Sequence, residues 1–203
     1  MPTLQEVTLH TTPSSWTNHN LPPTSEHYQR VVGVSTELGS VACRFEIATP
    51  TTGSTYQVTQ DFAARLLGFF DRYTADIDPE RWSVASEMLA PIYRYNCHTF
   101  ALHMLGEDIS DRSYVYQRIP ELNKRYTPTL GPLAAGRHGI IRSQNYPDRI
   151  SHSVIGLGED IPVCIQVMNS DSNIALVPYE ALPTVFMGGY RPVELYRPYE
   201  LAA

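Results

Sequence analysis

The sequence predicts an α+β fold in which helices precede a C-terminal antiparallel sheet. Between residues 58 and 106, apolar side chains recur every three or four residues, which is the period of helices that bury one face. From residue 138 onward, short apolar runs are separated by turn residues, which is typical of strands joined in a meander. The two patterns occupy separate stretches with little alternation, so an α+β class is favoured over α/β.

The first part of the chain is predicted to contain an arm, two strands and two helices. Residues 1–29 are rich in Thr, Ser, Pro, Asn and His, and we expect an extended N-terminal arm there, followed by a single domain over residues 30–203. Residues 30–47 show the two-residue period of strands, with a turn near Gly39, and Thr49 to Gly53 break the pattern. A helix is expected over 58–74. A second helix is expected to begin at Asp78 and Pro79 and to end at Pro91.

The segment 94–106, RYNCHTFALHMLG, predicts a helix with one apolar face, formed by Cys97, Phe100, Ala101, Met104 and Leu105. Asn96 suits the N-cap, which puts Cys97 at the first helical position, and Gly106 is a natural stop. A further helix is expected over 110–118, followed by a connection over 119–136 that is rich in Pro, Gly and Ala.

The second half is predicted to form four strands in an antiparallel meander. The runs are HGIIR (138–142), SHSVIGLG (151–158), VCIQVMN (163–169) and NIALVPY (173–179), with turn residues between the last three. We place the core of the domain at residues 93–182, the stretch over which the chain resembles a known family as described below.

Composition excludes several classes of protein. The 203 residues are 42 % hydrophobic, which is enough to bury a core, and carry a net charge of −6. That charge argues against non-specific nucleic-acid binding, and no apolar run reaches the roughly 18 residues that a membrane helix needs. We therefore expect no nucleic-acid partner and no membrane span. No signal peptide is visible, so a cytoplasmic protein and one exported by a signal-independent route are both compatible with the sequence.

Metal and cofactor sites lack motif support. The three cysteines, Cys43, Cys97 and Cys164, show no CxxC spacing and cannot all pair with one another. A metal site from His138, His152 and Asp171 is conceivable but matches no known ligand spacing, and no phosphate-binding or serine-hydrolase motif is present. We expect no metal and no cofactor.

Cys97 is the candidate nucleophile. At the first turn of a helix, free backbone N–H groups and the helix dipole favour a thiolate, so we expect a lowered pKa, and the same N–H groups can stabilise an oxyanion. His152 opens a strand after a loop and is the candidate base, with His138 as an alternative. Gln166, the strongly polar residue within an apolar strand, is the candidate that orients the imidazole.

Other polar residues near the cysteine have weaker signals. Tyr95, Asn96 and His98 are candidate substrate-binding residues, with packing or capping as the alternative for each. Asn169 and Asp171 are alternatives to Gln166, but they lie in a predicted turn, where they would cap backbone groups.

The order YNCHTFA, LAAGRHGII, ISHSVIGLG, VCIQVMN and NIALVPYEAL resembles the papain-like peptidoglycan hydrolases of the NlpC type, over about residues 93–182. The resemblance implies a papain-like fold in which the nucleophile helix packs on the C-terminal antiparallel sheet. It also implies Cys97 as nucleophile, His152 as base and Gln166 as the orienting residue. His98 and Arg137 depart from that family's pattern, and residues 1–90 have no counterpart in it.

The function expected from these residues is that of a cysteine hydrolase that cleaves an amide bond, with cell-wall peptide as the substrate that the resemblance implies. The first alternative keeps the chemistry and changes the substrate. The chain would be a deamidase, protease or acyltransferase acting on a protein partner, such as an exported effector or toxin with a cognate inhibitor or immunity protein. The second alternative is a binding domain without enzymatic activity, in which Cys97 is core packing.

Overall fold

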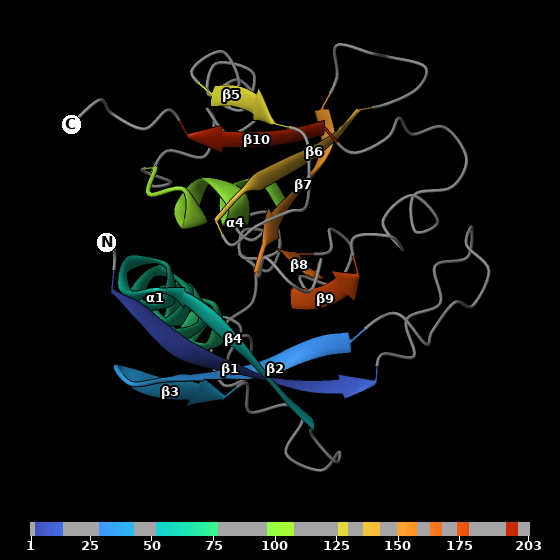
Figure 1. Ribbon diagram of the computed structural model, residues 1–203. Coiled ribbons are helices and arrows are strands. Elements are labelled where there is room, and N and C mark those ends of the chain that lie inside the picture. Colours follow the sequence, from blue (N-terminus) through green and yellow to red (C-terminus); the bar gives the residue numbers. More distant parts are fainter. Residues whose placement is uncertain are drawn as a thin grey trace.

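The computed structural model describes residues 3–13, 29–42, 52–76, 97–107, 126–129, 136–142, 150–157, 163–167, 174–178 and 194–198. These segments form one antiparallel sheet and two helices (Figure 1). The fold is therefore mixed, with helices and an antiparallel sheet, as the sequence predicts.

The sheet has ten strands in the order β4-β1-β2-β9-β8-β7-β6-β10-β5, with β3 paired to β2. The bounds are β1 Leu4–Pro13, β2 Gln29–Thr36, β3 Gly39–Ala42, β4 Thr52–Thr59, β5 Tyr126–Thr129, β6 His138–Arg142, β7 Ile150–Gly156, β8 Val163–Val167, β9 Ile174–Pro178 and β10 Glu194–Pro198. β2 joins the N-terminal strands to the C-terminal strands of the sheet, because it pairs with β1 along one edge and, through its first two residues, with β9 along the other.

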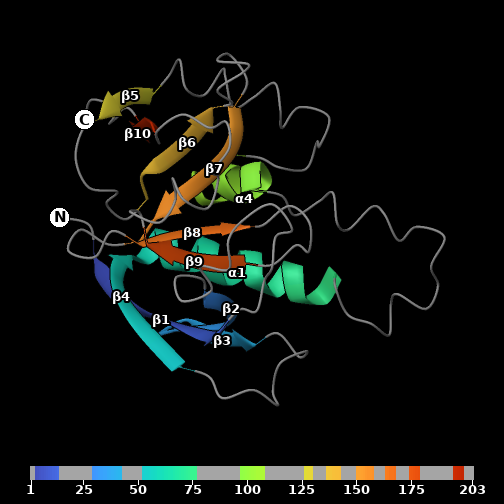
Figure 2. The same ribbon diagram turned by 90° about the vertical axis from the view of Figure 1, so that its right-hand side faces the viewer.

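Two helices, α1 (Gln60–Asp76) and α4 (Cys97–Met104), share the concave side of the twisted sheet (Figures 1 and 2). α1 contacts β1 to β4, whereas α4 contacts β7 and β8. Both helices and both halves of the sheet contribute to one hydrophobic core, whose largest buried members include Leu9, Leu66, Phe69, Phe70, Phe100 and Ile155. The predicted amphipathic faces of the helices are thus the faces that the sheet covers.

The two helices are locked together by aromatic and polar contacts. The rings of Phe69 and Phe100 meet edge to face, with centroids 4.8 Å apart. His103 Nε2 donates a hydrogen bond to the carbonyl of Arg65 at 2.8 Å, and the Arg65 guanidinium donates to the carbonyl of Met104 at 3.0 Å. The second bond satisfies one of the carbonyls that a helix end leaves free, so α1 fixes where α4 ends.

Gly106 ends α4 as the sequence predicts. Its φ of 80° lies in the left-handed region, its N–H donates to the carbonyl of His103, and the N–H of Glu107 donates to that of Leu102. This pair of bonds is the Schellman arrangement, which favours glycine because a side chain is strained at that φ.

Several predicted elements are confirmed. The strands with a turn near Gly39 are β2 and β3, the helix expected over 58–74 is α1, and the cysteine helix is α4. The four-strand meander is β6 to β9, all paired antiparallel.

The interpretation of the N-terminal region is wrong in two respects. Leu4–Pro13 is not an arm but strand β1, which lies between β4 and β2 and buries Val7 and Leu9. The break expected to include Thr52 and Gly53 is instead the start of β4. β1 and β4 therefore precede the first helix in addition to the expected strands, because Thr- and Ser-rich segments that look like loops in composition pair with one another here.

Other differences lie later in the chain. Part of the expected 119–136 connection forms β5, and β10 joins β5 to β6. The helices expected at Asp78 and over 110–118 lie outside the described residues, as does Cys43.

Candidate functional site

Cys97 is the first residue of α4, the position that the sequence predicts for it. α4 packs against β7, and the Cys97 side chain has no exposed surface. The residues that follow it, from His98 to Leu102, are buried as well, so the first turn of α4 is enclosed.

The backbone N–H groups of Cys97 itself, His98 and Ser153 all act on the Cys97 sulfur to favour its charged form, and that of Ser153 has the largest effect. The first two belong to the free N–H groups of a helix start. The third comes from β7. The N–H of Gly156 donates to Arg137 on the β6 side, so the backbone alternation of β7 directs the Ser153 N–H to the opposite edge, where the sulfur lies.

The expected lowering of the thiol pKa is wrong for this structure. Complete burial raises the pKa of Cys97 to about 12, and the three N–H groups offset this only in part. Burial prevails because a thiolate without water loses more solvation than a few N–H dipoles return. At neutral pH the group is a neutral thiol.

His152 lies in β7 directly before Ser153, and its side chain is buried. Side chains alternate along a strand, so the ring of His152 leaves β7 on the face opposite the Ser153 hydroxyl. The backbone N–H of Ser153 lies in the plane of the sheet. The Cys97 sulfur that it contacts therefore lies at the edge of β7, beside the backbone of His152 and Ser153. His152 also acts electrostatically on His98, whose pKa it helps to lower.

A buried cluster of two histidines and a serine adjoins the sulfur. Ser153 Oγ is 2.9 Å from His98 Nδ1 and 3.0 Å from His138 Nε2, and all three residues are at most 3 % exposed. Burial lowers the pKa of His98 to about 3, with a further lowering by His152 and His138, and burial alone lowers that of His138 to about 3. Both rings are neutral at physiological pH.

For His98 the structure favours the packing alternative over the substrate-binding one. A substrate-binding residue should border an open cleft, but His98 is turned inward to Ser153, because the whole first turn of α4 is covered. Sequence reasoning missed Ser153 altogether. The pairing register of β6 and β7 could have pointed to Ser153. Ile140 of β6 pairs with Ser153, and His138 lies two residues from Ile140, so His138 and Ser153 are on the same face of the sheet.

Gln166 lies in β8, where its backbone pairs with Ala175 of β9. Its neighbour Ile165 pairs with Ile155 of β7, so β8 is the strand next to the candidate base, as expected. The side chain of Gln166 lies outside what the structure describes, and so do Tyr95, Asn96, Asn169 and Asp171.

Metal ligation has no support in the part of the chain that the structure describes. There, no group of three or more His, Cys, Asp or Glu side chains is arranged to hold an ion. Within the same segments, no helix has the length and apolar character to cross a membrane.

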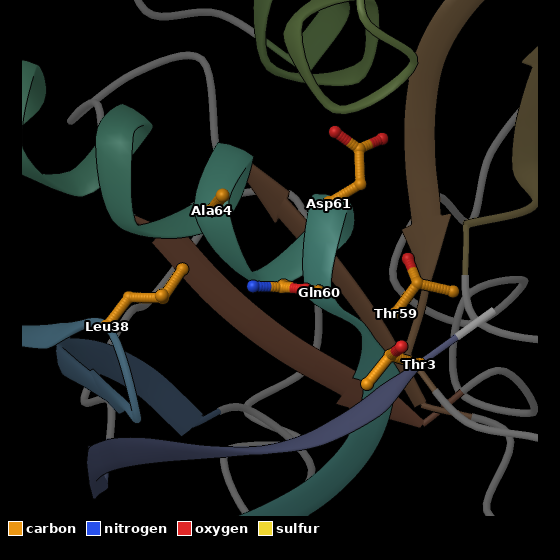
Figure 3. A pocket seen from close by; sticks show the side chains of 6 residues that line it. All are labelled: Thr3, Leu38, Thr59, Gln60, Asp61 and Ala64. Carbon is orange, nitrogen blue, oxygen red and sulfur yellow. The ribbon is translucent and has the colours of Figure 1, made fainter.

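An open pocket of about 380 Å³ lies at the start of α1 (Figure 3). It is lined by Thr3, Leu38, Thr59, Gln60, Asp61 and Ala64. Thr59 Oγ1 accepts the N–H of Phe62 and Asp61 pairs with Arg65, so these polar groups serve the first turns of α1. None of the residues predicted from the sequence to form a site lines this pocket.

Comparison with protein-family models, curated proteins and solved structures gave no match for this chain.

Proposed function

We propose that the protein is a cysteine hydrolase that cleaves an amide bond, with Cys97 as nucleophile, His152 as base and Gln166 as the residue that orients the imidazole, in a papain-like arrangement. One observation carries the proposal. The Cys97 sulfur lies at the start of α4 within hydrogen-bonding reach of the helix N–H groups and of β7 at the residue after His152. A nucleophile and donors for an oxyanion thereby meet beside the backbone of the strand that carries the candidate base, and the His152 ring, which leaves the other face of that strand, must turn toward the sulfur for catalysis.

The raised pKa favours general-base catalysis over a preformed thiolate–imidazolium pair. In the proposed reaction, sulfur attacks the amide carbonyl as the imidazole removes the thiol proton, and the carbonyl oxygen becomes an oxyanion held by N–H groups of the α4 start. The C–N bond then breaks as the imidazole returns the proton to the leaving amine. Water hydrolyses the thioester and releases the acid and the thiol.

The sulfur has no exposed surface, so this reaction requires a rearrangement that opens the start of α4 to substrate. Activation by substrate or a partner would fit an enzyme acting on a large amide substrate. The resemblance of residues 93–182 to NlpC-type hydrolases favours cell-wall peptide. A protein substrate, as for an exported effector or toxin, is the alternative with the same chemistry.

The test is hydrolysis of soluble cell-wall peptides by the wild type and by Cys97→Ala. Loss of turnover in Cys97→Ala, with activity retained in the matched variants Cys43→Ala and Cys164→Ala, would support the proposal, and equal activity of Cys97→Ala and wild type would reject it. His152→Ala then tests the choice of base, since retained turnover in that variant would point to His138 instead. Intact-mass analysis of incubated proteins tests the alternative substrate, since deamidation adds about one dalton.

Complete burial of Cys97 favours a second candidate, a binding domain in which this thiol is core packing. Selective alkylation distinguishes the two. A thiol used only for packing stays inert to iodoacetamide until the protein unfolds, whereas a catalytic thiol reacts in the folded protein once a substrate or partner opens the site.

A further inference from the structure

Ser153 is the residue through which α4, β6 and β7 meet beside the Cys97 sulfur. Its backbone N–H hydrogen-bonds the sulfur, while its Oγ bonds His98 of α4 at 2.9 Å and His138 of β6 at 3.0 Å. The side chain is completely buried, so water does not compete for these bonds.

The hydrogen-bonding capacity of the hydroxyl makes this contact directional. A serine hydroxyl donates once, and each neutral imidazole offers one donor and one acceptor nitrogen. The hydroxyl can also accept twice, so with two imidazoles on it at least one ring donates an N–H to Oγ, and the other ring either donates to Oγ or accepts its hydrogen. Rotation of either ring breaks its bond to Oγ in a place where water does not replace it, so both rings are held in position.

We propose that Ser153 is a positioning residue for the Cys97 nucleophile, clamped by His98 and His138 so that the sulfur and β7 keep one relative placement. The inference rests on the proposed function and adds a residue to its site. His98 is the residue after Cys97, so fixing its ring fixes the first turn of α4. His152 is the residue before Ser153, so the same clamp fixes the backbone that carries the candidate base.

The test is Ser153→Ala, which keeps the backbone N–H to the sulfur and removes the clamp. Its matched control is Ser35→Ala, which removes a different serine–histidine hydrogen bond, the 2.9 Å contact of Ser35 Oγ with His10 Nε2 on β2 and β1. Two readouts are taken: kcat and KM on soluble cell-wall peptide, and the rate at which iodoacetamide labels the Cys97 peptide, measured by mass spectrometry in the folded protein.

Ser153→Ala should lower kcat about tenfold or more with little change in KM, because misplacement of a nucleophile affects the chemical step. Labelling of Cys97 should rise several-fold as the first turn of α4 loosens. Ser153→Thr, which restores the hydroxyl, should recover much of both, and Ser35→Ala should match the wild type. Equal effects of Ser153→Ala and Ser35→Ala would overturn the inference.

If Ser153→Ala does not fold, His138→Leu removes one of the two clamp bonds while filling the buried space, and it should shift both readouts in the same direction. An unchanged kcat and labelling rate in folded His138→Leu would overturn the clamp. Failure of the proposed function is a separate outcome, seen as equal turnover in wild type and Cys97→Ala. In that case the labelling rate still tests Ser153. If iodoacetamide labels Cys97 equally fast in Ser153→Ala and wild type, Ser153 does not position the sulfur. If labelling is several-fold faster in Ser153→Ala, Ser153 positions the sulfur although the protein is not a hydrolase.

Discussion

Acidification should destabilise this protein through His98 and His138. The ordinary pKa of a histidine is about 6.5, and burial lowers both to about 3 in the folded state. Between about pH 6.5 and pH 3 these two histidines are protonated in the unfolded chain but stay neutral in the folded protein. Stability is therefore complete above about pH 6.5 and is lost progressively as pH falls toward 3. Burial also lowers the pKa of His103, which adds loss in the same direction.

The size of the effect follows from the two pKa values. At pH 5 an unfolded histidine is mostly protonated, and each of these two imidazoles forfeits about 2 kcal/mol relative to neutral pH. Together they cost about 4 kcal/mol, a large share of the roughly 5–15 kcal/mol that stabilises an ordinary domain. The groups that act on His98 across the cluster are His152 and His138, and their charges lower its pKa further.

Urea unfolding at pH 7.5, 6 and 5 measures this loss directly. The wild type should lose stability steeply below pH 6.5, and the double variant His98→Gln/His138→Leu should lose about 4 kcal/mol less between pH 7.5 and 5. Gly68→Ala, a change in α1 that removes neither His98 nor His138, should keep the wild-type slope. The same pH slope in the double variant and the wild type would refute the reasoning, because both histidines would then titrate normally in the folded state.

Further predictions concern the packing of the helices and of β1, all measured as free energies of unfolding in urea at pH 7.5. Phe100→Ala should cost about 3–5 kcal/mol, since the ring is fully buried against α1. Gly106→Ala should cost about 1–2 kcal/mol, because alanine is strained at its φ of 80° and its Cβ would lie 2.8 Å from the Arg65 guanidinium. The matched Gly68→Ala meets nothing within 4 Å in a helix and should stabilise by about 0.5–1 kcal/mol. Deletion of residues 1–13 should abolish cooperative unfolding, because it removes β1 from between β4 and β2; a cooperative transition in the deletion variant would contradict this.

The cysteine helix was predictable because its signals are local. The apolar spacing from Cys97 onward and the stop at Gly106 lie within one short segment, and both survive in α4. The meander β6 to β9 was predictable for the same reason, since neighbouring strands in sequence pair as neighbours in the sheet.

The N-terminal strands were not predictable from composition, although a periodic signal is present. Gln5, Val7 and Leu9 alternate with exposed or half-buried residues in β1, and Tyr56 and Val58 do so in β4. Thr and Ser fill the intervening positions, and they are compatible with both loops and strands. The pairing of β1 with β4 joins residues about fifty positions apart, and that choice depends on the whole sheet rather than on local preference.

The candidate site shows the same division between local and tertiary information. The sequence places a thiol at a helix start, which by itself lowers a thiol pKa. Whether that thiol meets water depends on the packing of α4 under β7, and the packing buries it completely. Helix-start dipoles act through a few hydrogen bonds, whereas burial removes the whole hydration shell of the charged form, so burial decides the sign. Because the first turn of α4 is enclosed, His98 bonds Ser153 instead of lining a cleft. For the same reason, Cys97 can react with a substrate only when the first turn of α4 opens. A catalytic role for this thiol therefore requires a second, open state, and the labelling rate of Cys97 in the folded protein measures how often that state is reached.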